Sequence, residues 1–216
     1  MHKDTATLWP TYIFTYEYKD FQSDLKDELV AEIYKQAEKQ RKDINSGVAE
    51  SLKSNLKESH FSFFNSHKEP IVKLKQFFID SLNNMISVEL PKVDAWKPTR
   101  ELEPKIFDSW YHIANNGGFH DVHLHSRTSW AGIFYVQSDE CTFEGLNGIN
   151  NFFNFDTNKN ILDAGAEWTE RLGHFRAEPK EGNLILFPGW VPHNATPYKG
   201  NQDRIVVSVN TQILYK

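Results

Sequence analysis

The 216-residue chain has a single cysteine, Cys141, so it cannot close a disulfide within itself. An unpaired thiol is typical of proteins in reducing compartments. The first residues, MHKDTATLWPTYIF, lack the basic start and the apolar core of a secretory signal peptide. No window approaches about eighteen consecutive apolar residues, the length that a membrane-spanning helix needs. We therefore expect a cytoplasmic protein with no membrane partner.

The chain also lacks an excess of basic residues. Its formal net charge is −5 and its pI is about 6.0, which is unfavourable for binding a nucleic-acid backbone, so no nucleic-acid partner is expected. Aromatic residues are abundant instead, at 14% of the chain, with sixteen Phe and six Trp. This content predicts a well-packed globular protein, and we expect residues 1–216 to form a single domain.

Two stretches near the N-terminus, residues 21–43 and 69–86, have the apolar spacing of amphipathic helices. The apolar positions are Leu25, Leu29 and Ile33 in the first stretch, and Ile71, Leu74, Phe78, Leu82 and Met85 in the second. Such faces usually build a core, and we assign both to packing. Residues 1–90 are therefore expected to be mainly helical.

The texture changes after a loop at 90–104 that contains three prolines. Residues 104–216 hold many short strand-like stretches, separated by turn sequences such as NNGG, EGLNG and KEGN. Too few helices intervene for a parallel sheet, so the pattern predicts an α+β protein with a jelly-roll or other double-sheet core flanked by the N-terminal helices. The weakly patterned stretch 156–173 fits either an active-site lid or a surface insertion.

The stretch DVHLHSRTSWAGIFYVQ, residues 121–137, is unusually rich in metal-binding side chains. In a strand, Asp121, His123 and His125 share one face, while His120 and its alternate neighbours point the other way. A face with one carboxylate and two imidazoles is unfavourable to bury without a partner. Either these residues bind a metal, or the face is simply solvated.

A third histidine follows about seventy residues later, in EGNLILFPGWVPHNATPYKGNQDRIVVSVN. His193 opens one strand of this stretch, and Arg204 opens the next. Arg204 shares a strand face with Ser208 and Asn210, an arrangement suited to binding a carboxylate. The alternative is a structural arginine that pairs with an acid such as Asp203.

Together these residues resemble the 2-oxoglutarate-Fe(II) oxygenases, which have a double-stranded β-helix (cupin-like) core related to the prolyl hydroxylases. The resemblance spans nearly the whole chain and includes LWPTYIFTYEY, the SN pair of LKSNLKESH, HLHSRTSWAGIFYVQ and GNLILFPGWVPHNATPYKGNQDRIVVSVN. It implies that His123 and His193 bind iron and that Arg204 and Ser208 bind the distal carboxylate of 2-oxoglutarate. Tyr135 matches a tyrosine that completes this pocket, or else is a buried core residue.

The sequence departs from the family at the second ligand, where His-x-Asp is usual and His-Leu-His stands here. Iron is then held by His123, His125 and His193, or Asp121 supplies a carboxylate in reversed order. Asp121 and His125 are four residues apart, about 13 Å in a flat strand at ~3.3 Å per residue, so both cannot easily join His123 on one metal. The His-x-His run favours His125, which makes the site more positive by one charge.

The resemblance implies a non-haem dioxygenase that uses Fe(II) and 2-oxoglutarate, hydroxylates a small-molecule or peptide substrate, and releases succinate and CO2. One alternative is a cupin-like enzyme with a three-histidine metal site and no need for 2-oxoglutarate. The other is a jelly-roll binding module without catalysis. Metal binding without 2-oxoglutarate binding would indicate the first alternative, and no metal binding would indicate the second.

Overall fold

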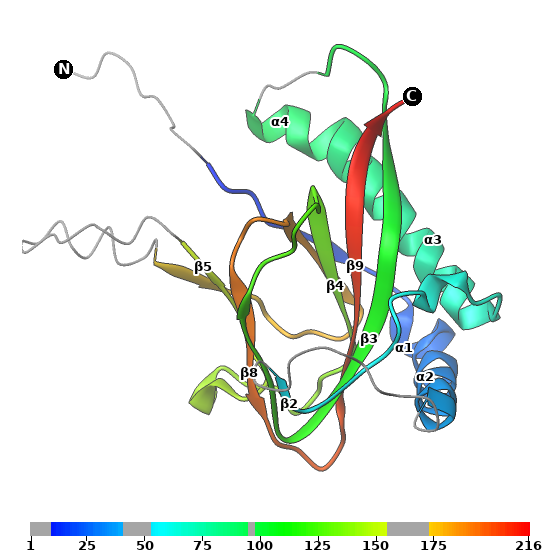
Figure 1. Ribbon diagram of the computed structural model, residues 1–216, viewed down its shortest axis with the longest axis vertical. Helices are drawn as coiled ribbons and strands as arrows, with labels where there is room; N and C mark the ends of the chain where they lie inside the picture. The colour runs from blue at the N-terminus through cyan, green and yellow to red at the C-terminus, as the bar shows by residue number, and fades with distance from the viewer. Residues whose placement is uncertain (1–9, 41–52, 95–97, 155–172) are drawn as a thin grey trace, which may run out of the picture.

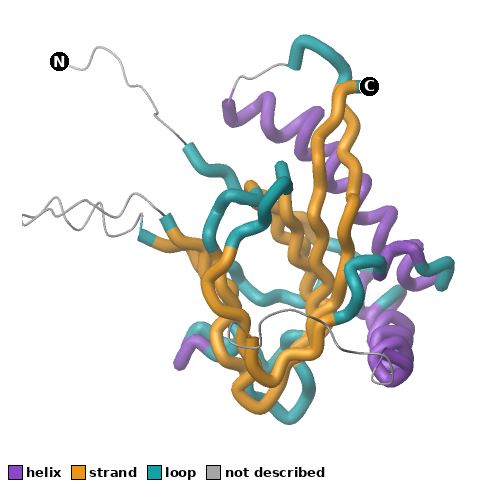
Figure 2. The backbone as a smooth tube through the Cα atoms, in the orientation of Figure 1, coloured by secondary structure: helices purple, strands orange, loops and turns teal. Residues whose placement is uncertain are grey.

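The computed structural model describes residues 10–40, 53–94, 98–154 and 173–216. Its centre is one antiparallel sheet, with strands in the order β1-β7-β4-β9-β3-β8-β5-β6 and β2 paired to β3. The sheet curls back on itself as a half-barrel, which confirms the predicted double-stranded β-helix type of fold (Figure 1). In tube form the long helices lie along one side of the curled sheet (Figure 2).

The strands are short except for two, and their bounds are β1 (Phe14–Glu17), β2 (Lys53–Glu58), β3 (Leu102–His123), β4 (Trp130–Gln137), β5 (Asn150–Phe153), β6 (His174–Arg176), β7 (Asn183–Pro188), β8 (His193–Tyr198) and β9 (Arg204–Tyr215). The long strands β3 and β9 pair with each other over most of their length. The N-terminal part of the chain is not purely helical, because it contributes β1 and β2.

The helices are α1 (Phe21–Asp24), α2 (Lys26–Gln40), α3 (Glu69–Asn84) and α4 (Leu90–Asp94), with a π-helical turn, Met85–Glu89, between the last two. The first predicted helix is thus interrupted at Leu25, and residues 41–43 lie outside the described residues. In the second, Pro70 occupies the first turn, where its missing N–H costs nothing. Within the described residues, no helix is long and apolar enough to cross a membrane.

The predicted apolar faces of these helices build the core. Leu29 and Ile33 of α2 and Leu74 and Phe78 of α3 are fully buried against the outer face of the sheet. On the inner face a second cluster forms around Tyr135, Phe152, Phe187 and Val206. Strand β9 contributes to both clusters, because Val207 packs in the outer cluster and Val206 in the inner one.

The strand β3 differs most from expectation. The turn sequence NNGG was expected to separate two short strands, but one strand runs through it from Leu102 to His123. It bends at Asn116 and Gly117, where φ is positive (50° and 82°), and then changes partner from β9 to β8. The bend therefore carries one strand from the first layer of the curled sheet to the second. The segment 156–172, for which a lid or an insertion was expected, lies outside the described residues.

Ser109 ties the 3-10 turn at Phe63–Asn65 to β3, and its loss should be measurable. Its Oγ accepts a hydrogen bond of 2.8 Å from the backbone N–H of Phe64 in a buried setting. Ser109→Ala leaves that N–H unsatisfied and should lower the free energy of unfolding by about 1–3 kcal/mol, measured by urea denaturation. The control Ser23→Ala, which removes an exposed hydrogen bond to Asp20, should cost less than about 0.5 kcal/mol. Equal effects would contradict this assignment.

Candidate metal and carboxylate-binding site

Three histidines meet where β3 ends and β8 begins. His123 is the last residue of β3 and pairs across the ladder with His193, the first residue of β8. His125 follows two residues later in a loop, and its backbone N–H donates to the carbonyl of Gly189 at 2.8 Å. One ring nitrogen from each of the three lies within 4.8 Å of the others. The three histidines are therefore grouped closely enough that they could hold a metal ion.

The geometry within this cluster suits metal coordination. The Nε2 atoms of His125 and His193 are 3.2 Å apart. Two nitrogens at that separation subtend about 100° at a metal with bonds of ~2.1 Å, close to an octahedral or tetrahedral angle. The Nδ1 atoms are engaged elsewhere: that of His193 with the carbonyl of Val191 at 3.1 Å, and that of His123 with the carbonyl of Asp121 at 2.7 Å. A neutral imidazole that donates from Nδ1–H carries its lone pair on Nε2, which is the atom that would bind a metal.

Burial keeps the central histidine neutral. His193 is 2% exposed, and this desolvation, together with the nearby His123 and His125, holds its pKa well below the usual value. A neutral imidazole keeps the lone pair that a metal requires. The site is therefore poised to accept a cation at neutral pH.

Asp121 lies apart from these three histidines. Its side chain is exposed, and its Oδ1 accepts from the backbone N–H of Val122 at 2.7 Å. The predicted shared face of Asp121, His123 and His125 requires an extended chain, but β3 ends at His123. The strand pairing ends there, and His125, rather than Asp121, belongs to the cluster with the other two histidines.

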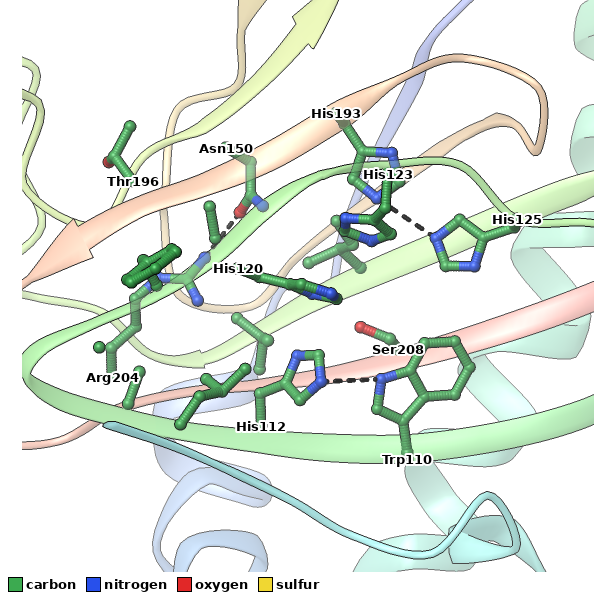
Figure 3. Close-up of a pocket in the computed structure, with 17 residues that line it drawn as sticks. Trp110, His112, His120, His123, His125, Asn150, His193, Thr196, Arg204 and Ser208 are labelled. Atoms are coloured by element: carbon green, nitrogen blue, oxygen red, sulfur yellow. Dashed lines mark hydrogen bonds between the residues drawn. The ribbon is translucent and has the colours of Figure 1, made fainter. Parts of the chain in front are cut away.

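His120 also lies in the site, although it was expected on the opposite face. Register shifts interrupt the β3–β8 ladder on both sides of His120 and rotate it inward. Its ring stacks on that of His123, with centroids 3.7 Å apart, and it projects into the cavity (Figure 3). The cavity measures about 30 Å³, so a ligand larger than a few atoms enters only if lining side chains such as His120 move.

Arg204 opens onto the same cavity and is almost fully buried, at 3% exposure. Its Nε donates to the carbonyl of Gly148 at 2.9 Å and its Nη2 to Oδ1 of Asn150 at 2.6 Å. Asp203, the acid expected to pair with a structural Arg204, has other partners: its carboxylate accepts from Tyr34 (3.0 Å) and Asn115 (3.0 Å). In the described part of the chain no carboxylate pairs with Arg204.

The other predicted carboxylate-binding residues divide into two groups. Ser208 lines the cavity, opposite Trp110 across the β3–β9 ladder. Tyr135 is fully buried outside the lining, and its O–H donates to Asn150 at 3.0 Å; burial raises its pKa. Asn210 lies beyond Ser208, outside the lining, and its Nδ2 donates to Asp108 at 3.2 Å.

Sequence reasoning missed several polar residues of the cavity wall. The Oδ1 of Asn150 accepts from Arg204 (Figure 3) and also from the Tyr135 O–H. His112, which lines the cavity, is paired with Glu58 of β2 at 2.6 Å between Nε2 and Oε2. On β3, the cavity is also lined by Trp110, Ala114 and Gly118, which are spaced four residues apart and so share a strand face. This spacing could have suggested that the face points inward. It does not reveal the partners that these residues meet on other strands.

Comparisons with known proteins agree with this geometry. A family model described as "Putative 2OG-Fe(II) oxygenase" matches residues 108–210, which contain the three histidines and Arg204. No curated protein matches the chain in sequence.

Solved structures of prolyl hydroxylases have a similar fold. A prolyl-4-hydroxylase from Pseudomonas putida is 14% identical, with a TM-score of 0.54 over 93% of this chain and 91% of its own. The viral collagen prolyl hydroxylase of Paramecium Bursaria Chlorella virus-1, solved with 2-oxoglutarate, is 14% identical, with a TM-score of 0.53 over 93% and 95% of the two chains. A prolyl hydroxylase from Trichoplax adhaerens is 14% identical, with a TM-score of 0.53 over 92% of this chain and 82% of its own.

Proposed function

The chain belongs to the 2OG-Fe(II) oxygenase family through residues 108–210, and from this premise we propose that His123, His125 and His193 hold Fe(II) while Arg204 and Ser208 bind the distal carboxylate of 2-oxoglutarate. When bound, iron and 2-oxoglutarate would activate O2, which is the oxidant: one oxygen atom would enter a substrate C–H bond as a hydroxyl group, the other would enter succinate, and CO2 would be released. The protein's own residues orient the two groups and limit access of water to them.

One observation carries this proposal: a buried guanidinium without a carboxylate partner among the described residues opens onto the cavity that the three histidines line. A buried charge of this kind is unfavourable until an anion neutralises it. Tyr135 would influence the carboxylate site indirectly, through its hydrogen bond to Asn150. Asn210, which donates to Asp108, stays a predicted neighbour of the pocket.

The test is an anaerobic titration of the purified protein with Fe(II) and then 2-oxoglutarate, following the visible charge-transfer absorption of the iron–keto-acid complex. We expect stoichiometric iron binding followed by a saturable band. Iron binding without a band would favour the three-histidine enzyme, a candidate supported by the absence of a carboxylate from the cluster. No iron binding would favour the binding module and overturn the proposal.

The third ligand can be assigned by two variants in the same titration. His125→Ala should weaken Fe(II) binding by about 100-fold or more and remove the band, because it deletes one of three protein donors. Asp121→Ala should keep both within about 3-fold, because its exposed carboxylate accepts from the Val122 N–H and lies outside the histidine cluster found among the described residues. The opposite pattern would restore the aspartate as ligand.

We further propose that the substrate is a small molecule or a peptide and that the enzyme works in the cytoplasm. The reduced state of Cys141, the chain's only cysteine, and the need to keep iron as Fe(II) both fit a reducing compartment. The formal charge of −5 argues against a nucleic-acid substrate. Fractionation of cells that express the protein tests the location.

A further inference from the structure

Asn150, the first residue of β5, connects Arg204 to the inner core. Its side chain is 4% exposed, and its Oδ1 accepts from Arg204 Nη2 at 2.6 Å and from the Tyr135 O–H at 3.0 Å. Its Nδ2 donates to the carbonyl of Asn194 at 3.2 Å. With two donors on the oxygen and a carbonyl on the nitrogen, only one orientation of the amide satisfies all its partners.

These contacts fix the plane of the Arg204 guanidinium. Gly148 holds its Nε edge and Asn150 holds Nη2, and both partners come from the same short stretch of chain. A guanidinium has five N–H donors in one plane, so two anchored bonds determine where the others point. Cys141 also lies against the guanidinium. The donors that these three partners leave over are available to a ligand's carboxylate in the cavity that Arg204 lines (Figure 3).

The chemical type of the anchor matters as much as its position. A carboxylate in place of Asn150 would orient Arg204 equally well, but it would also neutralise the guanidinium and compete with an incoming anion. A neutral amide orients the arginine and leaves its charge for the ligand. Tyr135 strengthens this role, because its O–H occupies the second lone-pair direction of the same oxygen.

We propose that Asn150 is the positioning residue that makes this site selective for 2-oxo acids with a second, distal carboxylate. The proposal rests on the proposed function, since it requires Arg204 to bind the co-substrate. Asn150 itself acts through Arg204. It should therefore influence binding of 2-oxoglutarate and have little influence on pyruvate, a 2-oxo acid that has no distal carboxylate.

The experiment compares both acids on the Fe(II)-loaded protein by anaerobic titration of the charge-transfer band. Asn150→Asp should raise the Kd for 2-oxoglutarate by at least about 30-fold, because the new carboxylate pairs with Arg204, while the Kd for pyruvate changes by less than about 3-fold. Asn150→Ala removes the anchor without adding charge. It should raise the Kd for 2-oxoglutarate by about 10-fold and leave the Kd for pyruvate unchanged.

The chain offers a closely matched control one residue away. Asn151 is also buried on β5, and its Oδ1 also accepts from an arginine, Arg176 Nε at 3.1 Å, but it does not line the cavity. Asn151→Asp should leave the Kd values for both acids within about 3-fold of the wild type. Melting temperature and Fe(II) stoichiometry of each variant establish that it is folded and loaded.

The outcomes separate this proposal from its premise. If wild-type protein binds iron but not 2-oxoglutarate, the proposed function itself fails. Two results with a wild type that binds 2-oxoglutarate would overturn the positioning role of Asn150. In the first, the Asn150 variants bind 2-oxoglutarate as tightly as the wild type. In the second, their Kd values for 2-oxoglutarate and pyruvate rise by the same factor. Asn150→Ala alone decides the question if Asn150→Asp does not fold.

Discussion

His193→Ala should retain less than stoichiometric Fe(II) after anaerobic dialysis. Its rate of O2-dependent succinate formation from 2-oxoglutarate should be at least about 1000-fold lower than that of the wild type. His193 is the most buried of the three clustered histidines, and the carbonyl of Val191 fixes its ring. Its Nε2 lies 3.2 Å from that of His125, so its removal leaves two donors, of which neither is buried to the same degree. Iron by elemental analysis and succinate by chromatography are the two measurements.

The fold of this variant should persist, because His193 is neutral and buried and its loss removes no ion pair. We expect the free energy of unfolding of the metal-free protein to change by no more than about 2 kcal/mol. His67→Ala, at an exposed histidine near the start of α3, is the control and should keep both iron and turnover. A His193→Ala protein that binds iron stoichiometrically and still forms succinate would show that the metal lies elsewhere.

The strand pattern near the C-terminus could be predicted from sequence because it is local. Alternation of apolar and polar residues from Arg204 onward indicated a strand with Arg204 and Ser208 on one face, and β9 has these bounds and this arrangement. His193 at the start of its strand was expected for the same reason. A period of two depends only on neighbouring residues, so nothing elsewhere in the chain had to be known.

The arrangement around His120 and Asp121 could not be predicted in this way. It depends on register shifts in the β3–β8 ladder and on where β3 ends, and both are set by pairing with strands about seventy residues away. A face assignment fails at the first bulge, because one extra residue turns every later side chain to the other side. This explains why His120 was placed outside the site and Asp121 too near it.

Asn150 and Glu58 had no sequence signal. Asn150 matters because Arg204 and Tyr135 reach it from β9 and β4, and Glu58 because β2 lies beside His112. Whether Arg204 pairs with Asp203 also depends on residues far away in the sequence. Tyr34 and Asn115, distant in sequence, occupy the carboxylate of Asp203.

Arg204→Met should raise the Kd for 2-oxoglutarate by at least about 100-fold while Fe(II) binding stays within about 3-fold. The guanidinium is 3% exposed and has no carboxylate partner among the described residues, so its charge is stabilised chiefly when an anion binds. Methionine has a similar length and no charge. Arg204→Lys keeps a cation but loses the planar fork that Gly148 and Asn150 hold, so an intermediate loss of about 10-fold or more is expected.

Stability distinguishes this role of Arg204 from a structural one. Removing one partner of a buried ion pair costs about 3–5 kcal/mol, whereas removing an unpaired buried charge relieves desolvation and offsets the hydrogen bonds lost at Gly148 and Asn150. We therefore expect Arg204→Met to lower the free energy of unfolding by no more than about 2 kcal/mol. Arg176→Met, at an exposed arginine of β6, should affect neither quantity. A strongly destabilised Arg204→Met that binds 2-oxoglutarate normally would make Arg204 a structural residue and leave the co-substrate's distal carboxylate without a site.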